Sequence, residues 1–389
     1  MNVSEKRIEY GSDKVADKQK ALRGSGNMNE HFPEMADKVY AHLNDEISKK
    51  IFEARRSFAS TGDIGYITGL DSKYRNLNSD MQVFAEKLQK GSHCLIYGAG
   101  VAGHYLTGRF KQFGVIVDCF IDQDESKGSV DKDTGIKVIT EKELKENKAL
   151  YCDKTVIISY PVKPVADGVR KRLIEDIGID EKNICFGIFD LRNNQGQYFD
   201  YFEARENEVF VDCGCFDGAT CFNFAGWCGA KGFDHIYSFE ADQKNYAKSK
   251  EILAPLGKCD LYPYGTADSS KKVYFAAEAF ETSCIISREE AEKRKFEGVE
   301  EIECVALDDV LEGKKITFIK MDIEGAEYEA LLGARKLIME NRPRMAISVY
   351  HKFEDFVTLA NLVLEMHPDY RIAFRHYGFD DLETVMYVE

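Results

Sequence analysis

Two glycine-rich turns are the first places where this sequence could do chemistry. In the first, Gly98, Gly100 and Gly103 form G-x-G-x-x-G between an apolar run and a helical stretch, and Asp122 ends the next apolar run. Such glycines let a pyrophosphate approach a helix N-terminus, and a carboxylate roughly 20 residues further on can bind a ribose hydroxyl. The turn predicts either a nucleotide or sugar-nucleotide site or a glycine turn kept for close helix–strand packing.

The second turn lies in VFVDCGCFDGATCFNF, residues 209–224. Asp212, Gly214 and Gly218 give it the spacing D-x-G-x-x-x-G, and the following apolar run ends at Glu240. A carboxylate in that place can accept hydrogen bonds from both hydroxyls of a ribose. Because the central glycine of the dinucleotide pattern is missing, the turn favours a ligand with one nucleoside and no pyrophosphate.

Acidic residues and a histidine follow two later apolar runs. Asp322 and Glu324 follow FIKM, and His351 follows MAISVY. Since open α/β sheets bind ligands at the carboxyl ends of their strands, we expect these side chains beside the second turn. A carboxylate, or an imidazole with its ordinary pKa near 6.5, can take a proton from a hydroxyl. We predict Asp322 and His351 as catalytic residues, with either one or a water as the base. Glu327 could equally stabilise the first turn of the next helix.

Two parallel sheets are needed to position these motifs. Apolar runs alternate with helical stretches from His93 to about Asp190, and a second alternation starts at Val209 after a polar stretch. Upstream, apolar residues at four-residue spacing predict helices between residues 33 and 58 and over 79–89. We predict an N-terminal helical segment (1–90), a smaller Rossmann-like α/β domain (91–191) and a larger α/β domain (192–389).

Composition excludes several classes of function. Lys and Arg total 52 against 67 Asp and Glu, and the net charge of −15 opposes binding to nucleic acid or to anionic membranes. The N-terminus lacks a secretory signal, and no apolar run is long enough to span a bilayer, so we expect a cytoplasmic protein without membrane insertion. The densest cysteine group consists of Cys213, Cys215, Cys221 and Cys228, and it lacks the paired spacing of a zinc site. We therefore predict that no metal is bound.

The run FIKMDIEGAEYEALLGA, residues 318–334, resembles the signature of the FkbM family of methyltransferases, K-x-D-x-E-G-x-E followed by an apolar helix. FEADQKNY, ALDDVL, RMAISVYHKFED and ETVMYV extend the resemblance over nearly all of the C-terminal domain. There are two departures. Ala241 stands where the family usually has proline, and Phe216 with Asp217 replaces the usual Asn-x pair.

The resemblance implies a class I methyltransferase fold, which is Rossmann-like with a mostly parallel seven-stranded sheet. It also implies transfer of a methyl group from S-adenosylmethionine to a hydroxyl of a small molecule, sugar or glycan. Asp268, after the run LYPYG, is a candidate for contact with the adenine amino group. The predicted cofactor-binding residues are Asp212, Gly214, Gly218, Glu240, Asp242 and Asp268.

Two other classes of protein remain open. An NAD-dependent oxidoreductase, or a sugar-nucleotide-binding protein, would use the first glycine turn. Tyr246 and Lys250 have the Tyr-x-x-x-Lys spacing of many such oxidoreductases, but this is also the spacing of an ordinary helix face. The other alternative is a binding module that keeps the fold without catalysis, which we would expect to have lost some of the site residues.

Overall fold

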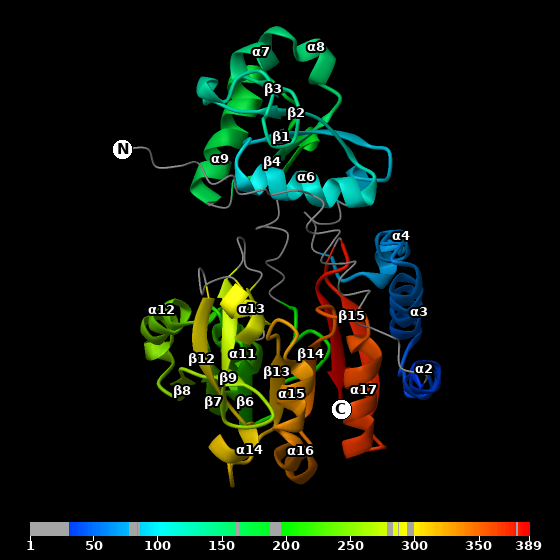
Figure 1. Cartoon of the computed structure of the whole chain (residues 1–389), viewed down its shortest axis with the longest axis vertical. Coiled ribbons are helices and arrows are strands. Elements are labelled where there is room, and N and C mark those ends of the chain that lie inside the picture. Colours follow the sequence, from blue (N-terminus) through cyan, green and yellow to red (C-terminus); the bar gives the residue numbers. More distant parts are fainter. Residues whose placement is uncertain are drawn as a thin grey trace. The chain divides into compact units, whose positions relative to one another are not determined.

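The structure is a computed structural model that describes residues 31–77, 84, 86–160, 163–186, 196–277, 283–286, 288–293, 299–378 and 380–389. These residues form two compact units (Figure 1). One unit comprises the described part of Leu77–Asn193, and the other combines Phe32–Asn76 with the described part of Asn194–Glu389. The predicted boundary at residue 90 is therefore not where the units divide. Residues 1–30 and most of the helix expected over 79–89 lie outside the described residues.

The first unit is a parallel five-stranded sheet with the order β3-β2-β1-β4-β5. Its strands are short and almost wholly apolar because helices from the crossover connections cover them. The strands are β1 (His93–Tyr97), β2 (Ile116–Ile121), β3 (Val138–Ile139), β4 (Thr155–Ile158) and β5 (Ile184–Phe186). The main helices are α6 (Val101–Phe113), α7 (Glu141–Glu146), α8 (Lys148–Tyr151) and α9 (Lys163–Arg172).

The C-terminal unit is built on a seven-stranded sheet with the order β15-β16-β14-β13-β6-β7-β8. Every neighbouring pair is parallel except the two pairs that contain β16. The strands are β6 (Glu208–Cys213), β7 (Phe233–Phe239), β8 (Cys259–Tyr262), β13 (Phe318–Met321), β14 (Arg344–Ser348), β15 (Ile372–His376) and β16 (Thr384–Val388). The predicted α/β class with a mostly parallel sheet is confirmed.

Helices cover both faces of this sheet. One face packs against α2 (Phe32–Ala41), α3 (Glu46–Thr61), α15 (Glu327–Leu332), α16 (Arg335–Asn341) and α17 (Asp355–Met366). The other face packs against α11 (Ala219–Cys228) and α12 (Gln243–Leu253). The helices predicted between residues 33 and 58 join this unit because Phe52 packs against Phe356 of α17 and Phe374 of β15.

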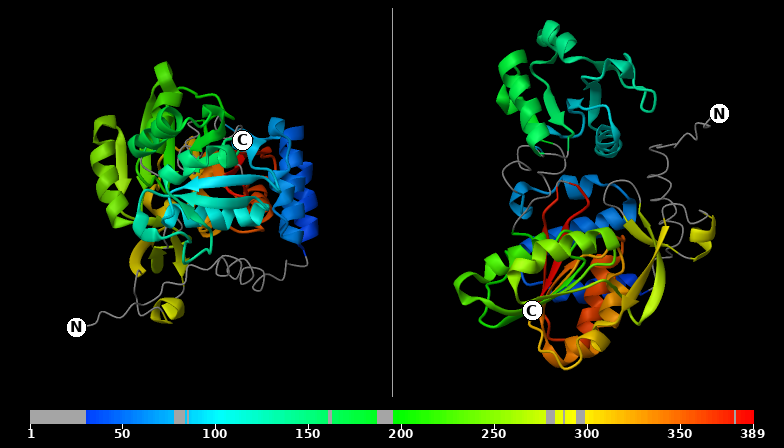
Figure 2. Two further views of the ribbon diagram at one scale, coloured as in Figure 1. Left: turned by 90° about the horizontal axis from the view of Figure 1, so that it is seen from above. Right: turned by 90° about the vertical axis from the view of Figure 1, so that its left-hand side faces the viewer.

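A second, smaller sheet with the order β11-β10-β12-β9 lies between β8 and β13 in the chain and is drawn in yellow in Figure 2. It consists of β9 (Gly265–Thr266), β10 (Lys271–Ala277), β11 (Ser283–Ile286) and β12 (Val299–Val305). Its β10–β11 and β10–β12 pairs are antiparallel and its β12–β9 pair is parallel, and the alternation of strands and helices did not predict this insertion.

The segment before β6 belongs to the core, although its polar sequence suggests a linker. The ring of Phe199 lies 5.6–6.0 Å from the rings of four aromatic residues behind the central strands: Phe210, Phe224, Trp227 and Phe318. Phe199 is 2% exposed. Residues 196–202 are thereby fixed against the sheet. Among the described residues, no helix combines the length and the apolar character that crossing a bilayer requires.

Candidate functional site

Four parallel strands end at one edge of the C-terminal sheet, and a predicted site residue belongs to the end of each. The register pairs Asp212 of β6 with Lys320 of β13 and with Ser238 of β7. Glu240, just after β7, and Asp322, just after β13, therefore lie at the same edge as the second glycine turn. His351 follows β14 there as well. Open α/β sheets bind ligands at this edge.

Gly214 lets the turn after β6 lie directly against the end of β13. Its φ is +81°, and a Cβ at this position would lie 2.2 Å from the carbonyl oxygen of Asp322. Only glycine fits such an approach in this backbone conformation. Gly218, with φ +80°, begins α11, and a Cβ there would lie 3.0 Å from the side chain of Leu253. Both glycines shape the turn.

Lys320, which was not predicted from the sequence, stabilises this turn through contacts on its buried side. Its Nζ lies 3.1 Å from Oδ1 of Asp212, and it donates to the carbonyls of Cys213 at 3.2 Å and Gly214 at 2.5 Å. Burial alone would lower the pKa of Lys320, but the charges of Asp212 and Asp322 raise it above its usual value. Asp212 thus supports the turn through a buried ion pair. The lysine of the K-x-D-x-E-G pattern was the available signal.

Glu240 ties the end of β7 to the same turn. One carboxylate oxygen accepts the backbone N–H of Phe216 at 2.8 Å, and the other accepts that of Asp242 at 2.9 Å. The residue is 8% exposed, and burial raises its pKa. Phe216 is itself exposed and has a left-handed φ of +52°, unusual for a non-glycine residue. Asp242 caps α12, accepting from the backbone N–H groups of Lys244 and Asn245.

Asp268 is not brought together with these residues. Its carboxylate is exposed and pairs with Lys271 at 2.5 Å. Its Cα would lie 3.1 Å from a Cβ on Gly333, which follows the C-terminal end of α15. The contact of Asp268 with adenine stays a prediction.

Two tyrosines that sequence reasoning missed hold the carboxylate of Asp322. Tyr198 donates to Oδ2 at 2.7 Å, and Tyr350 donates to Oδ1 at 3.2 Å. Burial would raise the pKa of Asp322, but the charges of His351 and Lys320 and the Tyr198 hydrogen bond together hold it below its usual value. Tyr350 is adjacent to His351 in sequence, whereas Tyr198 gave no local signal.

His351 lies among three carboxylates. Its Nδ1 is 3.0 Å from Oε1 of Glu327, and its Nε2 is 3.5 Å from Oδ1 of Asp322 and 3.8 Å from Oε2 of Glu324. Burial alone would lower the pKa of His351, but Glu327, Asp322 and Glu324 raise it to about 10. The imidazole therefore carries its proton at neutral pH. The pKa of His351 thus differs from the ordinary value near 6.5, and its role as a base stays a prediction.

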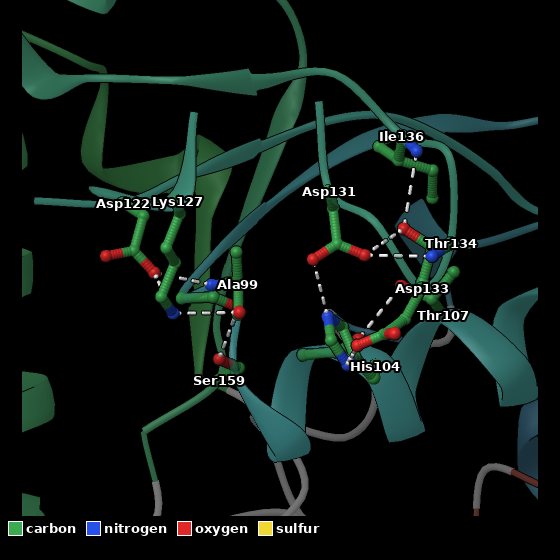
Figure 3. Close-up of polar contacts among 12 residues, drawn as sticks. Ala99, His104, Thr107, Asp122, Lys127, Asp131, Asp133, Thr134, Ile136 and Ser159 are labelled. Carbon is green, nitrogen blue, oxygen red and sulfur yellow. Dashed lines mark hydrogen bonds and ion pairs between the residues drawn. The ribbon is translucent and has the colours of Figure 1, made fainter. Parts of the chain in front are cut away.

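In the first glycine turn, internal contacts occupy the predicted ribose carboxylate. Asp122 accepts from the backbone N–H of Ala99 at 2.8 Å, from Nζ of Lys127 at 2.9 Å and from the backbone N–H of Asp124 at 2.9 Å. Lys127 also donates to the carbonyl of Ala99 at 2.8 Å, so it lies between Asp122 and the turn (Figure 3). The carboxylate of Asp122 therefore stabilises its own loop in this structure.

Packing explains two of the three glycines in that turn. A Cβ on Gly98, whose φ is +105°, would lie 2.5 Å from Oγ of Ser159, and one on Gly103 would lie 2.0 Å from the carbonyl oxygen of Gly98. Gly100 has only Nζ of Lys127 nearby, at 4.0 Å. Gly98 and Gly103 thus support the packing explanation of the motif, while Gly100 is not required by it. Lys250, of the Tyr-x-x-x-Lys pair, is exposed on α12.

Comparison with known proteins matches part of this chain to a family of methyltransferases. Residues 212–380 match the methyltransferase FkbM domain, and no curated protein matches the chain. A methyltransferase FkbM from Methylobacillus flagellatus is 18% identical, with the similarity covering 88% of this chain and 99% of that one at a TM-score of 0.50. This likeness shows the fold.

Two further solved structures cover about half of this chain. A putative methyltransferase from Streptococcus mutans in complex with SAH is 15% identical, with 47% of this chain and 89% of that one covered at a TM-score of 0.28. A fibrillarin from Aeropyrum pernix with natively bound S-adenosyl-L-methionine is 10% identical, with 48% and 69% covered at a TM-score of 0.31.

Lys320→Met should destabilise the C-terminal unit by about 3–5 kcal/mol, because it leaves Asp212 charged and buried without a cation. The single tryptophan, Trp227, lies in this unit, and its fluorescence during urea unfolding measures the change. Lys315→Met, at an exposed position, is the control. Adding Asp212→Asn to Lys320→Met should restore part of the loss. Equal midpoints for Lys320→Met and Lys315→Met would contradict the assigned role of the pair.

Gly103→Ala should destabilise the first unit by roughly 1–3 kcal/mol, because the new methyl group overlaps the carbonyl of Gly98. Gly108→Ala, on the same helix with nothing within 4 Å, should be neutral or slightly stabilising. Hydrogen exchange of the β1 amides in the whole chain measures both effects. Wild-type protection of β1 in Gly103→Ala would rule out the packing explanation.

Proposed function

Over residues 212–380 this protein is a methyltransferase of the FkbM domain family, and from that premise we propose that it uses S-adenosylmethionine to methylate a hydroxyl oxygen of a small molecule, sugar or glycan. One observation carries the proposal. The buried carboxylate of Glu240 is hydrogen-bonded to the backbone of the glycine turn, at the edge where Asp322 also lies. A ribose binder and a polar group for the acceptor are thus presented at one edge of the sheet.

The residues at this edge fit the cofactor. Each oxygen of Glu240 accepts one backbone N–H and keeps a further lone pair, which a ribose hydroxyl can use. Gly214 lets the turn lie against the end of β13, which brings the turn and Asp322 together at the edge where the methionine portion of the molecule would bind. When bound, S-adenosylmethionine supplies an electrophilic methyl group on a positively charged sulfonium.

The charges at the edge suit a cationic ligand. Asp322, Glu324 and Glu327 lie 3.0–3.8 Å from the ring nitrogens of His351. The buried cation Lys320 already pairs with Asp212. Carboxylates outnumber cations here. This excess of negative charge would offset a sulfonium in a site where water is scarce.

We assign the acceptor's proton to Asp322. Tyr198 and Tyr350 fix its carboxylate at the edge, and the side chain keeps 23% of its surface exposed, so a hydroxyl can reach it. As the acceptor oxygen forms its bond to the methyl carbon, the carbon–sulfur bond breaks and the hydroxyl proton passes to Asp322. His351, protonated and held by Glu327, orients this carboxylate.

S-adenosylhomocysteine should bind the whole chain with its ribose on Glu240. Glu240→Ala removes a charge-assisted hydrogen bond of about 1.5–3 kcal/mol, so affinity should fall roughly ten- to a hundredfold. Isothermal titration measures it, with Glu251→Ala, exposed on α12, as the matched control. Unchanged affinity in Glu240→Ala, with its fold verified by circular dichroism, would contradict the assignment of Glu240 as the ribose-binding residue.

Incubation with labelled S-adenosylmethionine and a panel of sugars, sugar nucleotides and lipid-linked glycans tests the reaction itself. Label should appear on one acceptor class, and Asp322→Asn should lower turnover by about 10²–10⁴, as expected for a lost general base. Transfer to a carbon or nitrogen atom would overturn the choice of oxygen. Turnover within threefold of wild type in Asp322→Asn would remove it from proton transfer.

A further inference from the structure

We propose that His351, Asp322 and Glu324 form a binding site for one divalent metal cation, with Glu327 orienting the histidine. Oδ1 of Asp322 and Oε2 of Glu324 lie 3.5 Å and 3.8 Å from Nε2 of His351. Donor atoms of Asp322, Glu327 and His351 all lie within 4.8 Å of one another. The sequence pattern marked two of these residues as proton-transfer groups and predicted no metal. Their arrangement in space points to a metal instead.

The distances around Nε2 of His351 are those of ligands around a cation. Oδ1 of Asp322 lies 3.5 Å away and Oε2 of Glu324 lies 3.8 Å away. Neither is a good hydrogen bond. Two donors bound to the same cation at about 2.0–2.2 Å lie about 3–4.4 Å apart, depending on their angle. Both distances fall in that range.

An unpartnered buried atom supplies the second, independent observation. Nε2 and Nδ1 of His351 are both inaccessible to solvent and without a well-oriented hydrogen bond among the described residues, and the side chain is 9% exposed. Nδ1 still lies 3.0 Å from Glu327, whereas Nε2 has only the longer contacts to Asp322 and Glu324. Buried polar atoms are nearly always satisfied, and leaving one unsatisfied costs about 1–3 kcal/mol. Nε2 faces the two carboxylates, so a cation between the three groups would satisfy it by taking the place of the proton that this nitrogen carries in the metal-free protein.

Glu327 occupies the position that an orienting carboxylate takes behind a metal-bound histidine. Its Oε1 lies 3.0 Å from Nδ1 of His351 and accepts the backbone N–H of Ile323 at 2.9 Å. Glu327 is 1% exposed. Histidine ligands commonly donate their second ring N–H to such a carboxylate, which fixes the ring and makes the other nitrogen a better ligand. With Nδ1 beside Glu327, Nε2 faces Asp322 and Glu324.

The donor set selects the class of cation. One imidazole nitrogen with two carboxylate oxygens suits divalent first-row metals such as Mn²⁺ or Zn²⁺ better than Ca²⁺, which prefers oxygen ligands only. Three protein ligands leave coordination positions open. On the proposed function, an acceptor hydroxyl would take one of them, which favours acceptors with an oxygen near the methylated one, as in a sugar diol.

Metal binding by the whole chain tests this without any reading of methyl transfer. After chelation and desalting, the protein is titrated with Mn²⁺ and the signal of the free ion is followed by electron paramagnetic resonance, with a parallel Zn²⁺ titration by calorimetry. We expect one tight site per chain. His351→Gln should weaken it at least tenfold, and Glu327→Gln should weaken it about 10–100-fold, as for other orienting carboxylates.

Two further variants test the metal site even if the buried variants fail to fold. Glu324 is 40% exposed in its side chain, so Glu324→Gln should fold even if the buried variants do not, and it should lower affinity several-fold. Asp131→Asn is the matched control, because His104, Asp131 and Asp133 form the other donor group among the described residues. It should leave affinity unchanged.

Absence of stoichiometric Mn²⁺ or Zn²⁺ binding would overturn the proposal. So would wild-type affinity in Glu324→Gln and in every folded variant of His351 and Glu327, or a loss confined to Asp131→Asn. Because S-adenosylhomocysteine binding is measured separately, failure of the metal site leaves the proposed methyl transfer standing, and failure of methyl transfer leaves the metal result standing.

Discussion

The ammonium group of Lys320 lies between β6 and β13 and contacts the carboxylate of Asp212 and the carbonyls of Cys213 and Gly214. Asp212 is fully buried, and the Lys320 side chain is only 3% exposed, so each charge depends on the other. Because Lys320 and Asp212 fix the turn, Gly214 can lie against the carbonyl of Asp322. The position of the glycine turn and that of Asp322 are therefore set by one interaction.

Charge balance follows from this arrangement. The edge gathers Glu240, Asp322, Glu324 and Glu327, while Lys320 is committed to Asp212. His351 is left to compensate several carboxylates, which is why its pKa is raised to about 10 and why its nitrogens are faced by acidic groups on both sides of the ring. A positively charged ligand relieves the same excess. The sulfonium of the cofactor and a divalent cation would both be attracted by this excess of negative charge.

Local patterns in the sequence predicted the parts of the site that depend on neighbours along the chain. The glycine spacing and the carboxylates at strand ends, such as Glu240 and Asp322, follow from the strand–turn–helix unit itself. Lys320, Tyr198 and the helices α2 and α3 depend on contacts between distant segments, which no local pattern encodes. The first glycine motif shows the reverse case. Its spacing suggested a ribose ligand at Asp122, whereas Lys127 and the backbone already use that carboxylate.

The most direct test of the central claim is a crystal structure of the whole chain with S-adenosylhomocysteine. The account predicts the ribose hydroxyls on the carboxylate of Glu240, the homocysteine portion passing over Gly214, and its sulfur on the side of Asp322. Nucleoside density at Gly100 in the first unit, or at the C-terminal edge with its ribose away from Glu240, would contradict it.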